Sequence, residues 1–118
     1  MRSYKFTMPF PPSVNVWKSP FRNRMILTAR GRAYRAEAIK AMQSLNLDNE
    51  ALSGRLEVHL TLNPKTNRKY DIDNFCKSLF DAITKSGFWV DDEQIDKLVV
   101  KKGKKVKGGR VQVSVFCL

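Results

Sequence analysis

The sequence has few of the residues that build a disulfide framework, a zinc site or a membrane span. Its 118 residues include two cysteines, Cys76 and Cys117, and one histidine, His59. No Cys or His pair has zinc-ligand spacing, so we expect both cysteines to act as small hydrophobic side chains in a reducing compartment. No apolar run approaches the roughly 20 residues of a transmembrane helix, and the N-terminus has no hydrophobic signal segment. We therefore expect a cytoplasmic protein without a membrane partner.

Acidic residues are missing from both ends of the chain. Residues 1–36 contain eight bases and no acid, residues 97–118 contain seven bases and no acid, and every Asp and Glu lies between them. The formal net charge is +11, from 22 Lys plus Arg against 11 Asp plus Glu. Such a protein attracts phosphate backbones by counterion release and long-range steering. This distribution favours a nucleic-acid partner over a basic surface kept only for solubility.

The hydrophobic pattern predicts one domain, residues 1–118, of class α+β (α/β-like). Alternating apolar residues predict four strands, at 2–8, 56–62, 98–102 and 111–117. A helical period predicts two main helices, at 28–46 with Thr28 as N-cap and from Asp73 or Asn74 to Ser86 with Gly87 as C-cap. Residues 13–27 read as irregular, and residues 101–109 read as a basic hairpin tip. These elements indicate a small mixed sheet of about four strands covered by helices.

The apolar faces of the two predicted helices give the expected core. They are Tyr34, Ala38, Ala41, Met42 and Leu45 in the first helix, and Phe75, Leu79, Phe80 and Ile83 in the second.

The acids that do occur gather around one short segment. Asp71 and Asp73 stand two apart, so in an extended backbone their side chains point to the same side. Asp91 and Asp92 follow after one predicted helix and a short return toward the first pair. Clustered carboxylates in a basic chain are typical of a site for Mg²⁺, which prefers hard oxygen ligands and stabilises charge on a reacting phosphodiester. Lys77, one turn into the helix, is placed to contact that phosphate as a fixed cation.

Each of these residues also has a structural interpretation. Asp73 could simply cap its helix, and Asp91 with Gln94 matches a capping box, which favours Asp92 as the metal ligand of that pair. Lys77 and Asp81, four apart, could form a surface ion pair of small worth. An EF-hand loop is excluded because no Gly follows at its sixth position. His59 lies on the polar face of a predicted strand, and we assign it no role.

Four segments together resemble the RusA family of Holliday junction resolvases. The longest, residues 71–95, reads DIDNFCKSLFDAITKSGFWVDDEQI. The others are MPFPPSVN at 8–15, TARGRAYR at 28–35 and KGGR at 107–110, so the resemblance runs over nearly the whole chain. It implies a homodimeric RusA-like fold and symmetric, Mg²⁺-dependent cutting of four-way DNA junctions in recombination and repair. Mn²⁺ is expected to substitute for Mg²⁺, and no small-molecule cofactor is expected.

The resemblance also implies which residues carry the reaction. The three metal-binding aspartates fall on Asp71, Asp73 and Asp92 and the essential lysine on Lys77, while Asp91 stays open as ligand or cap. Basic side chains around them are expected to hold the DNA: Arg22, Arg24, Lys65, Arg68, Lys69, Lys101, Lys102, Lys104, Lys105, Lys107 and Arg110.

A four-way junction presents two symmetry-related strands, whereas each chain holds one acidic cluster. Paired incision therefore requires two copies, most simply related by a two-fold axis. The expected setting is the cytoplasm, in association with the nucleoid, and the gene could belong to a cell or to a phage.

Two other functions remain open at this point. One is a metal nuclease for other branched DNA, although a restriction-like core is disfavoured because Glu57-Val58-His59 has His where that core needs Lys. The other is a non-catalytic DNA-binding module in which the aspartates are caps and ion-pair partners.

Overall fold

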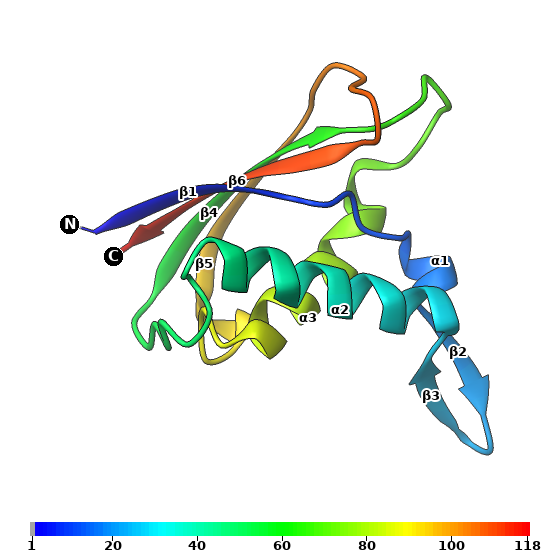
Figure 1. Ribbon diagram of the computed structural model, residues 1–118, viewed down its shortest axis with the longest axis horizontal. Coiled ribbons are helices and arrows are strands. Elements are labelled where there is room, and N and C mark those ends of the chain that lie inside the picture. Colours follow the sequence, from blue (N-terminus) through cyan, green and yellow to red (C-terminus); the bar gives the residue numbers. More distant parts are fainter. Residues whose placement is uncertain (1) are drawn as a thin grey trace.

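A computed structural model of the chain describes residues 2–118 and has a four-stranded mixed sheet at its centre (Figure 1). The strands are β1 (Ser3–Met8), β4 (Leu56–Asn63), β5 (Ile95–Lys102) and β6 (Arg110–Cys117), in the order β1-β6-β4-β5. β4 and β5 run parallel, and the other two pairs are antiparallel. The predicted mixed α+β class is confirmed.

The core lies between one face of this sheet and two helices, α2 (Ala29–Ser44) and α3 (Cys76–Ser86), which pack side by side (Figure 1). The alternation of β4 buries Leu56, Val58, Leu60 and Leu62, as predicted. Removing these apolar side chains from water is the main term that stabilises the fold.

The predicted helix ends are mostly right. Thr28 caps α2 by accepting a hydrogen bond from the Gly31 amide at 3.0 Å, and Gly87 ends α3 with a left-handed φ of 86°. The second helix begins differently, because a 3₁₀ turn, η1 (Ile72–Phe75), precedes α3.

The predicted helix faces are also mostly right. Tyr34, Ala38 and Met42 of α2 are buried, as are the last three of the predicted α3 stripe. Leu45 is 46% exposed, so its assignment to the core is wrong: α2 ends at Ser44, and the chain turns away there.

The segment predicted to be irregular is instead ordered. It contains a single helical turn, α1 (Val14–Trp17), and a two-stranded hairpin of β2 (Lys18–Phe21) and β3 (Arg24–Leu27). The hairpin forms a separate sheet that projects from the body beside the first turn of α2 (Figure 1).

The last two strands are not joined as the sequence predicted. β5 begins at Ile95 rather than residue 98, and it does not pair with β6, because β4 lies between them. The 101–109 segment is therefore not a hairpin tip. The physical reason is that β6 buries Val111, Val113 and Val115 at the centre of the sheet, whereas charged β5 suits an edge.

The first and last strands of the chain lie next to each other in the sheet. β1 pairs with β6 along its length, and the Cys117 amide donates to the Arg2 carbonyl at 3.0 Å. Within residues 2–118, no helix is both long and apolar enough to cross a bilayer.

Candidate active site

The Asp-x-Asp segment forms the entry to α3. Asp71 is in the N-cap position of η1, with φ of −85° and ψ of 135°, and its carbonyl accepts from the Asn74 amide at 3.2 Å. Its side chain makes no capping hydrogen bond, and Asp73 lies inside the turn. The alternative role of Asp73 as a helix cap is therefore wrong. Both carboxylates are exposed, where an ion or a phosphate can reach them.

Lys102, at the end of β5, holds this segment from the side. Its ammonium donates to the Tyr70 carbonyl at 2.7 Å and lies 4.5 Å from the centre of the Tyr70 ring. The Tyr70 ring packs edge-on against Phe75, and Phe75 packs in the same way against Phe10. A shallow hollow results, lined by Lys69, Tyr70, Asp71, Asn74 and Lys102.

Asp91 acts as a cap, as its spacing from Gln94 indicated. Its carboxylate accepts from the Glu93 amide at 3.3 Å, and its own amide donates to Gln94 Oε1 at 2.8 Å. The buried Gln94 amide group donates in turn to the carbonyls of Leu52 and Gly54, each at 2.8 Å. The capping box thus fixes η2 (Asp92–Gln94) against the chain leading to β4.

Asp92 lies in a negative and partly desolvated environment. Burial raises the pKa of its carboxyl, and a hydrogen bond shared with Asp91 and the charge of Asp81 raise it further. The Lys77 ammonium acts in the opposite direction and lowers the pKa. Asp92 and Lys77 are therefore close enough to interact electrostatically, although 15 positions separate them in the chain.

The neighbours of Lys77 connect it to both acidic segments. Cys76, beside it, has a pKa that is raised by burial and by the charge of Asp73. The α3 start is fixed by Ser78, whose hydroxyl donates to the Pro12 carbonyl at 2.7 Å. Asp81 pairs with Arg35 of α2 at 2.8 Å, and the salt bridges of the described residues include none between Lys77 and Asp81, so the alternative of a surface pair between these two is wrong. Lys77 thus lies one turn from Asp73 and within electrostatic reach of Asp92.

The aspartates do not form a closed cage. Among residues 2–118, no three Asp, Glu, His or Cys side chains lie close enough together to hold one metal ion. The structure brings Asp92 together with Lys77, and it places Asp71 beside Lys102 and Asn74.

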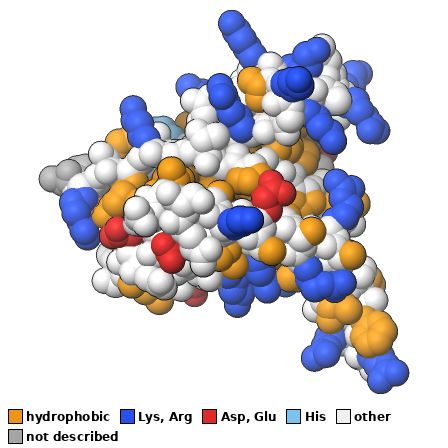
Figure 2. Space-filling model, viewed as in Figure 1, with side chains coloured by type: hydrophobic (Ala, Val, Ile, Leu, Met, Phe, Trp, Pro, Cys, Tyr) orange, Lys and Arg blue, Asp and Glu red, His pale blue; other side chains and the backbone are white. Residues whose placement is uncertain are grey.

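Most of the predicted DNA-binding bases occupy two regions, and Lys101, Lys102 and Arg110 lie at the ends of β5 and β6. Residues 63–69 and 103–109 run together at one end of the molecule, where Figure 2 shows a concentration of basic side chains. The Val106 amide donates to the Pro64 carbonyl at 2.9 Å. We call this pair of segments the basic loops; it carries Lys65, Arg68, Lys69, Lys104, Lys105 and Lys107. The second region is the β2–β3 hairpin with Arg22 and Arg24.

Asn63 is a structural residue of this region that the sequence did not reveal. Its buried amide group donates to the Lys104 carbonyl and accepts from Gln112, each at 2.9 Å. These partners lie 41 and 49 positions away, so no local pattern could have indicated them.

His59 interacts with Glu57 of its own strand, β4. Its ring is 2.6 Å from Glu57, and this hydrogen bond is the main reason that the pKa of Glu57 is lowered.

By homology, this chain is an endodeoxyribonuclease. The family model described as "Endodeoxyribonuclease RusA" matches residues 9–116. Proteins called crossover junction endodeoxyribonuclease RusA from Shigella sonnei (strain Ss046) and Escherichia coli (strain K12) are each 35% identical over 115 residues. Each match covers 98% of this chain and 95% of the relative. The counterpart from Enterobacteria phage HK97 is 33% identical with the same coverage. The chain belongs to the RusA family.

Proposed function

We propose that this protein is a Mg²⁺-dependent, structure-selective endodeoxyribonuclease that resolves four-way DNA junctions in recombination and repair. It acts as a homodimer that hydrolyses one phosphodiester on each of two opposed strands. The observation that carries this proposal is that the chain matches RusA proteins over almost its whole length, with Lys77 at the start of α3, four positions after Asp73.

The donor set fits a hard divalent cation. Asp71, Asp73 and Asp92 would hold it by drawing together around the ion, since their side chains do not gather at one point in the described residues. Mg²⁺ needs few protein ligands because it keeps several waters. Burial, and after it the nearby carboxyl groups, raise the pKa of Asp92 because both disfavour its charged form, and a bound cation would offset that penalty. When bound, the ion supplies Lewis acidity to the phosphate and to the attacking water. Asp91 is engaged in its capping box, which supports Asp92 as the ligand of the pair.

The chain's own residues orient and bind the DNA. Lys77 is suited to contact the reacting phosphate, where its fixed charge stabilises the negative charge that develops. Lys102 holds the backbone that carries Asp71. The basic loops and the hairpin supply the phosphate contacts on either side, together with Lys101 and Arg110 at the strand ends.

The first test is cleavage of a synthetic mobile four-way junction with Mg²⁺. We expect symmetric cuts on two opposed strands and little cutting of a flap or linear duplex of the same sequence. Flap cutting of equal efficiency would indicate a nuclease for other branched DNA. Magnesium-independent binding without any nicking would indicate a non-catalytic module.

The second test is Asp73→Asn. We expect cleavage to be abolished and junction affinity to be unchanged or higher, because one repulsive carboxylate is removed from the DNA-binding surface. Glu50→Gln, which neutralises an exposed acid elsewhere, is the matched control and should cut normally. Electrophoretic binding and cleavage of one labelled junction measure both properties. Loss of binding together with cleavage would show that Asp73 maintains the fold instead.

A further inference from the structure

The β2–β3 hairpin ends in a tight two-residue turn. β2 and β3 are antiparallel, with Lys18 opposite Leu27 and Phe21 opposite Arg24. The turn residues Arg22 and Asn23 have φ values of 48° and 63°. Two left-handed residues in succession are the signature of the turn whose twist matches that of paired strands. The result is a narrow ribbon whose tip extends away from the body (Figure 1).

Large apolar side chains lie at this tip. Phe21 is 49% exposed and Met25 is 57% exposed. Because Met25 is opposite Pro20, the register places Met25 and Phe21 on opposite faces of the ribbon. The Arg22 guanidinium lies 5.3 Å from the centre of the Phe21 ring. Figure 2 shows apolar surface surrounded by basic side chains over this hairpin. The tip therefore presents apolar surface on both faces within a positively charged border.

The base of the hairpin is fixed to α2. The Thr28 amide donates to the Trp17 carbonyl at 3.1 Å, and the Thr28 hydroxyl donates to the Val16 carbonyl at 2.6 Å. Gly31 lies so close to Trp17 that an added Cβ would be 2.3 Å from its carbonyl oxygen. Arg32 donates to the Leu27 carbonyl at 2.9 Å. These contacts hold the ribbon at one angle to α2, so its tip is presented to a partner without a large ordering cost.

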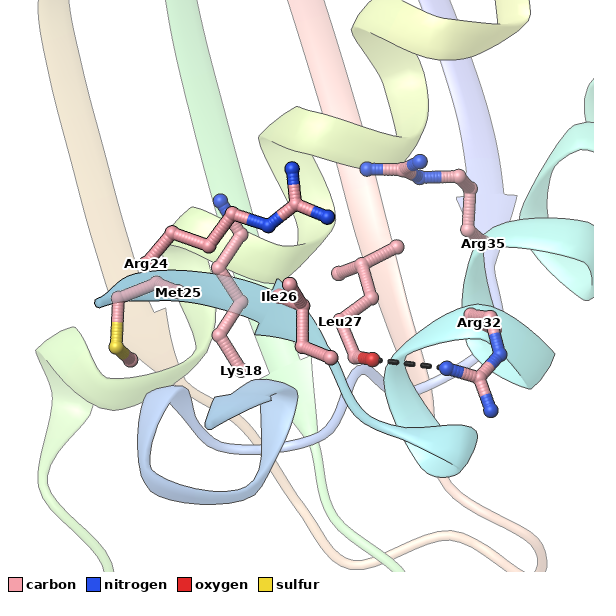
Figure 3. A pocket seen from close by; sticks show the side chains of 7 residues that line it. All are labelled: Lys18, Arg24, Met25, Ile26, Leu27, Arg32 and Arg35. Carbon is pink, nitrogen blue, oxygen red and sulfur yellow. Dashed lines mark hydrogen bonds between the residues drawn. The ribbon is translucent and has the colours of Figure 1, made fainter. Parts of the chain in front are cut away.

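A basic hollow lies between the hairpin and α2 (Figure 3). It is lined by the apolar residues Met25, Ile26 and Leu27 of β3 and by the bases Lys18, Arg24, Arg32 and Arg35. Arg35 is paired with Asp81, whereas the described salt bridges include no acid on Lys18, Arg24 or Arg32. Residues 1–36 contain no acid, so the complementary partner is a polyanion.

We infer that the β2–β3 hairpin is a base-contacting wedge. Its tip packs Phe21 and Met25 against bases that are unstacked at a DNA branch point, and the basic hollow holds the adjoining phosphates. A two-stranded ribbon is narrow enough to enter a DNA groove, and apolar side chains inserted between base steps are a known way to stabilise opened or kinked DNA. At a four-way junction this inference rests on the proposed function, and it names the element that would distinguish branched from continuous DNA.

The test is Phe21→Ala, alone and combined with Met25→Ala, with Leu45→Ala as the matched control at an exposed site at the end of α2. Each protein is titrated, without divalent metal, against a junction carrying 2-aminopurine at the branch point and against continuous duplex. We expect wild type and the Leu45 variant to change the 2-aminopurine fluorescence. The tip variants should not change it, and they should bind the junction about tenfold more weakly, within the range for loss of one base–aromatic stack. Their affinity for continuous duplex should remain that of wild type.

Two results would overturn the inference. One is unchanged junction affinity and fluorescence response in the tip variants. The other is conversion of a dimer to a monomer, measured by light scattering, because the tip would then contact a second protein copy.

Repeating the titration with a duplex that contains a short unpaired bulge separates this inference from the proposed function. A tip-dependent signal on the bulge supports the wedge even if wild-type protein fails to cut four-way junctions. Circular dichroism and thermal unfolding should be unchanged, because both side chains are largely exposed.

Discussion

At the residue scale, Lys102 differs from the other bases around the acidic segment. The sequence indicated a DNA-binding side chain, whereas its ammonium donates to the Tyr70 carbonyl directly before Asp71. It also lies over the Tyr70 ring, so two contacts fix its position. This geometry favours a positioning role, in which Lys102 acts on the reaction through the backbone that carries Asp71.

We expect Lys102→Met to reduce cleavage by about tenfold or more, since hydrogen bonds to charged groups contribute about 1.5–3 kcal/mol. The Mg²⁺ concentration for half-maximal cleavage should rise, and metal-free junction affinity should change little. Lys102→Arg should restore part of the activity, because it keeps the charge and the donors. Lys40→Met, on the exposed side of α2, is the control for loss of one positive charge.

If Lys102→Met instead weakens junction binding and reduces its salt dependence, Lys102 is a DNA-binding residue, because a side chain that binds phosphate behaves in this way.

Residue roles could be predicted from the sequence where the interaction is local. The capping box of Asp91 and Gln94 spans three positions and was recognised from spacing alone. The pairing of Asp81 with Arg35 could not be predicted, because Arg35 lies 46 positions away on another helix. The convergence of Asp71, Asp73 and Asp92 stays a prediction, since it depends on tertiary geometry and on the ion itself.

At the element scale, the strands and helices with a long repeating pattern were recognisable, and the hairpin was not. β4 spans eight residues with clear alternation, whereas β2 and β3 have four residues each. Pro20 interrupts the strand pattern, and the turn places Arg at a left-handed position that Gly or Asn usually occupies. Short elements with atypical turn residues carry little local signal, so their formation is decided by the contacts with α2.

The sequence also could not show that β5 and β6 are not neighbours in the sheet. A polar basic segment between two strands usually indicates a hairpin, but here the 103–109 segment crosses the end of β4. Strand order is set by which strand is apolar enough to lie centrally, and this requires comparing all four strands at once.

The basic loops are the element whose contribution to DNA affinity can be tested separately. We expect Lys104→Ala combined with Lys105→Ala to weaken junction binding and to reduce the slope of log affinity against log salt by about 0.9 for each phosphate that the variant no longer neutralises. Lys40→Ala combined with Lys85→Ala removes the same charge from the two helices and should leave the slope nearly unchanged. Fluorescence anisotropy over a salt series measures both. An unchanged slope in the loop variant would remove this loop from the DNA-binding surface.

At the scale of the whole molecule, the proposed dimer makes a prediction about mixtures. Wild-type chains mixed with an excess of Asp73→Asn chains should form dimers with one working site. We expect these dimers to nick one strand of a junction without the paired second cut. Denaturing and native gels of one cruciform plasmid distinguish nicked from linear product.

A second mixture tests whether each site belongs to one chain. We expect Asp73→Asn mixed with Asp92→Asn to stay inactive, because Lys77 lies near both acidic segments of the same chain. Nicking that appears only in the mixture would mean that Asp73 of one subunit works with Asp92 of the other.

The pairing of β1 with β6 joins residues 3–8 to residues 111–116. During synthesis the first strand must therefore wait, unpaired, until nearly the entire chain has left the ribosome. We expect the amide protons at this edge to be among the last to become protected as the protein folds, because such distant pairing is slow. A nascent chain stopped after β5 would lack β6, which lies between β1 and β4. One edge of β4 would then be unpaired and could pair with another chain, which leads to aggregation.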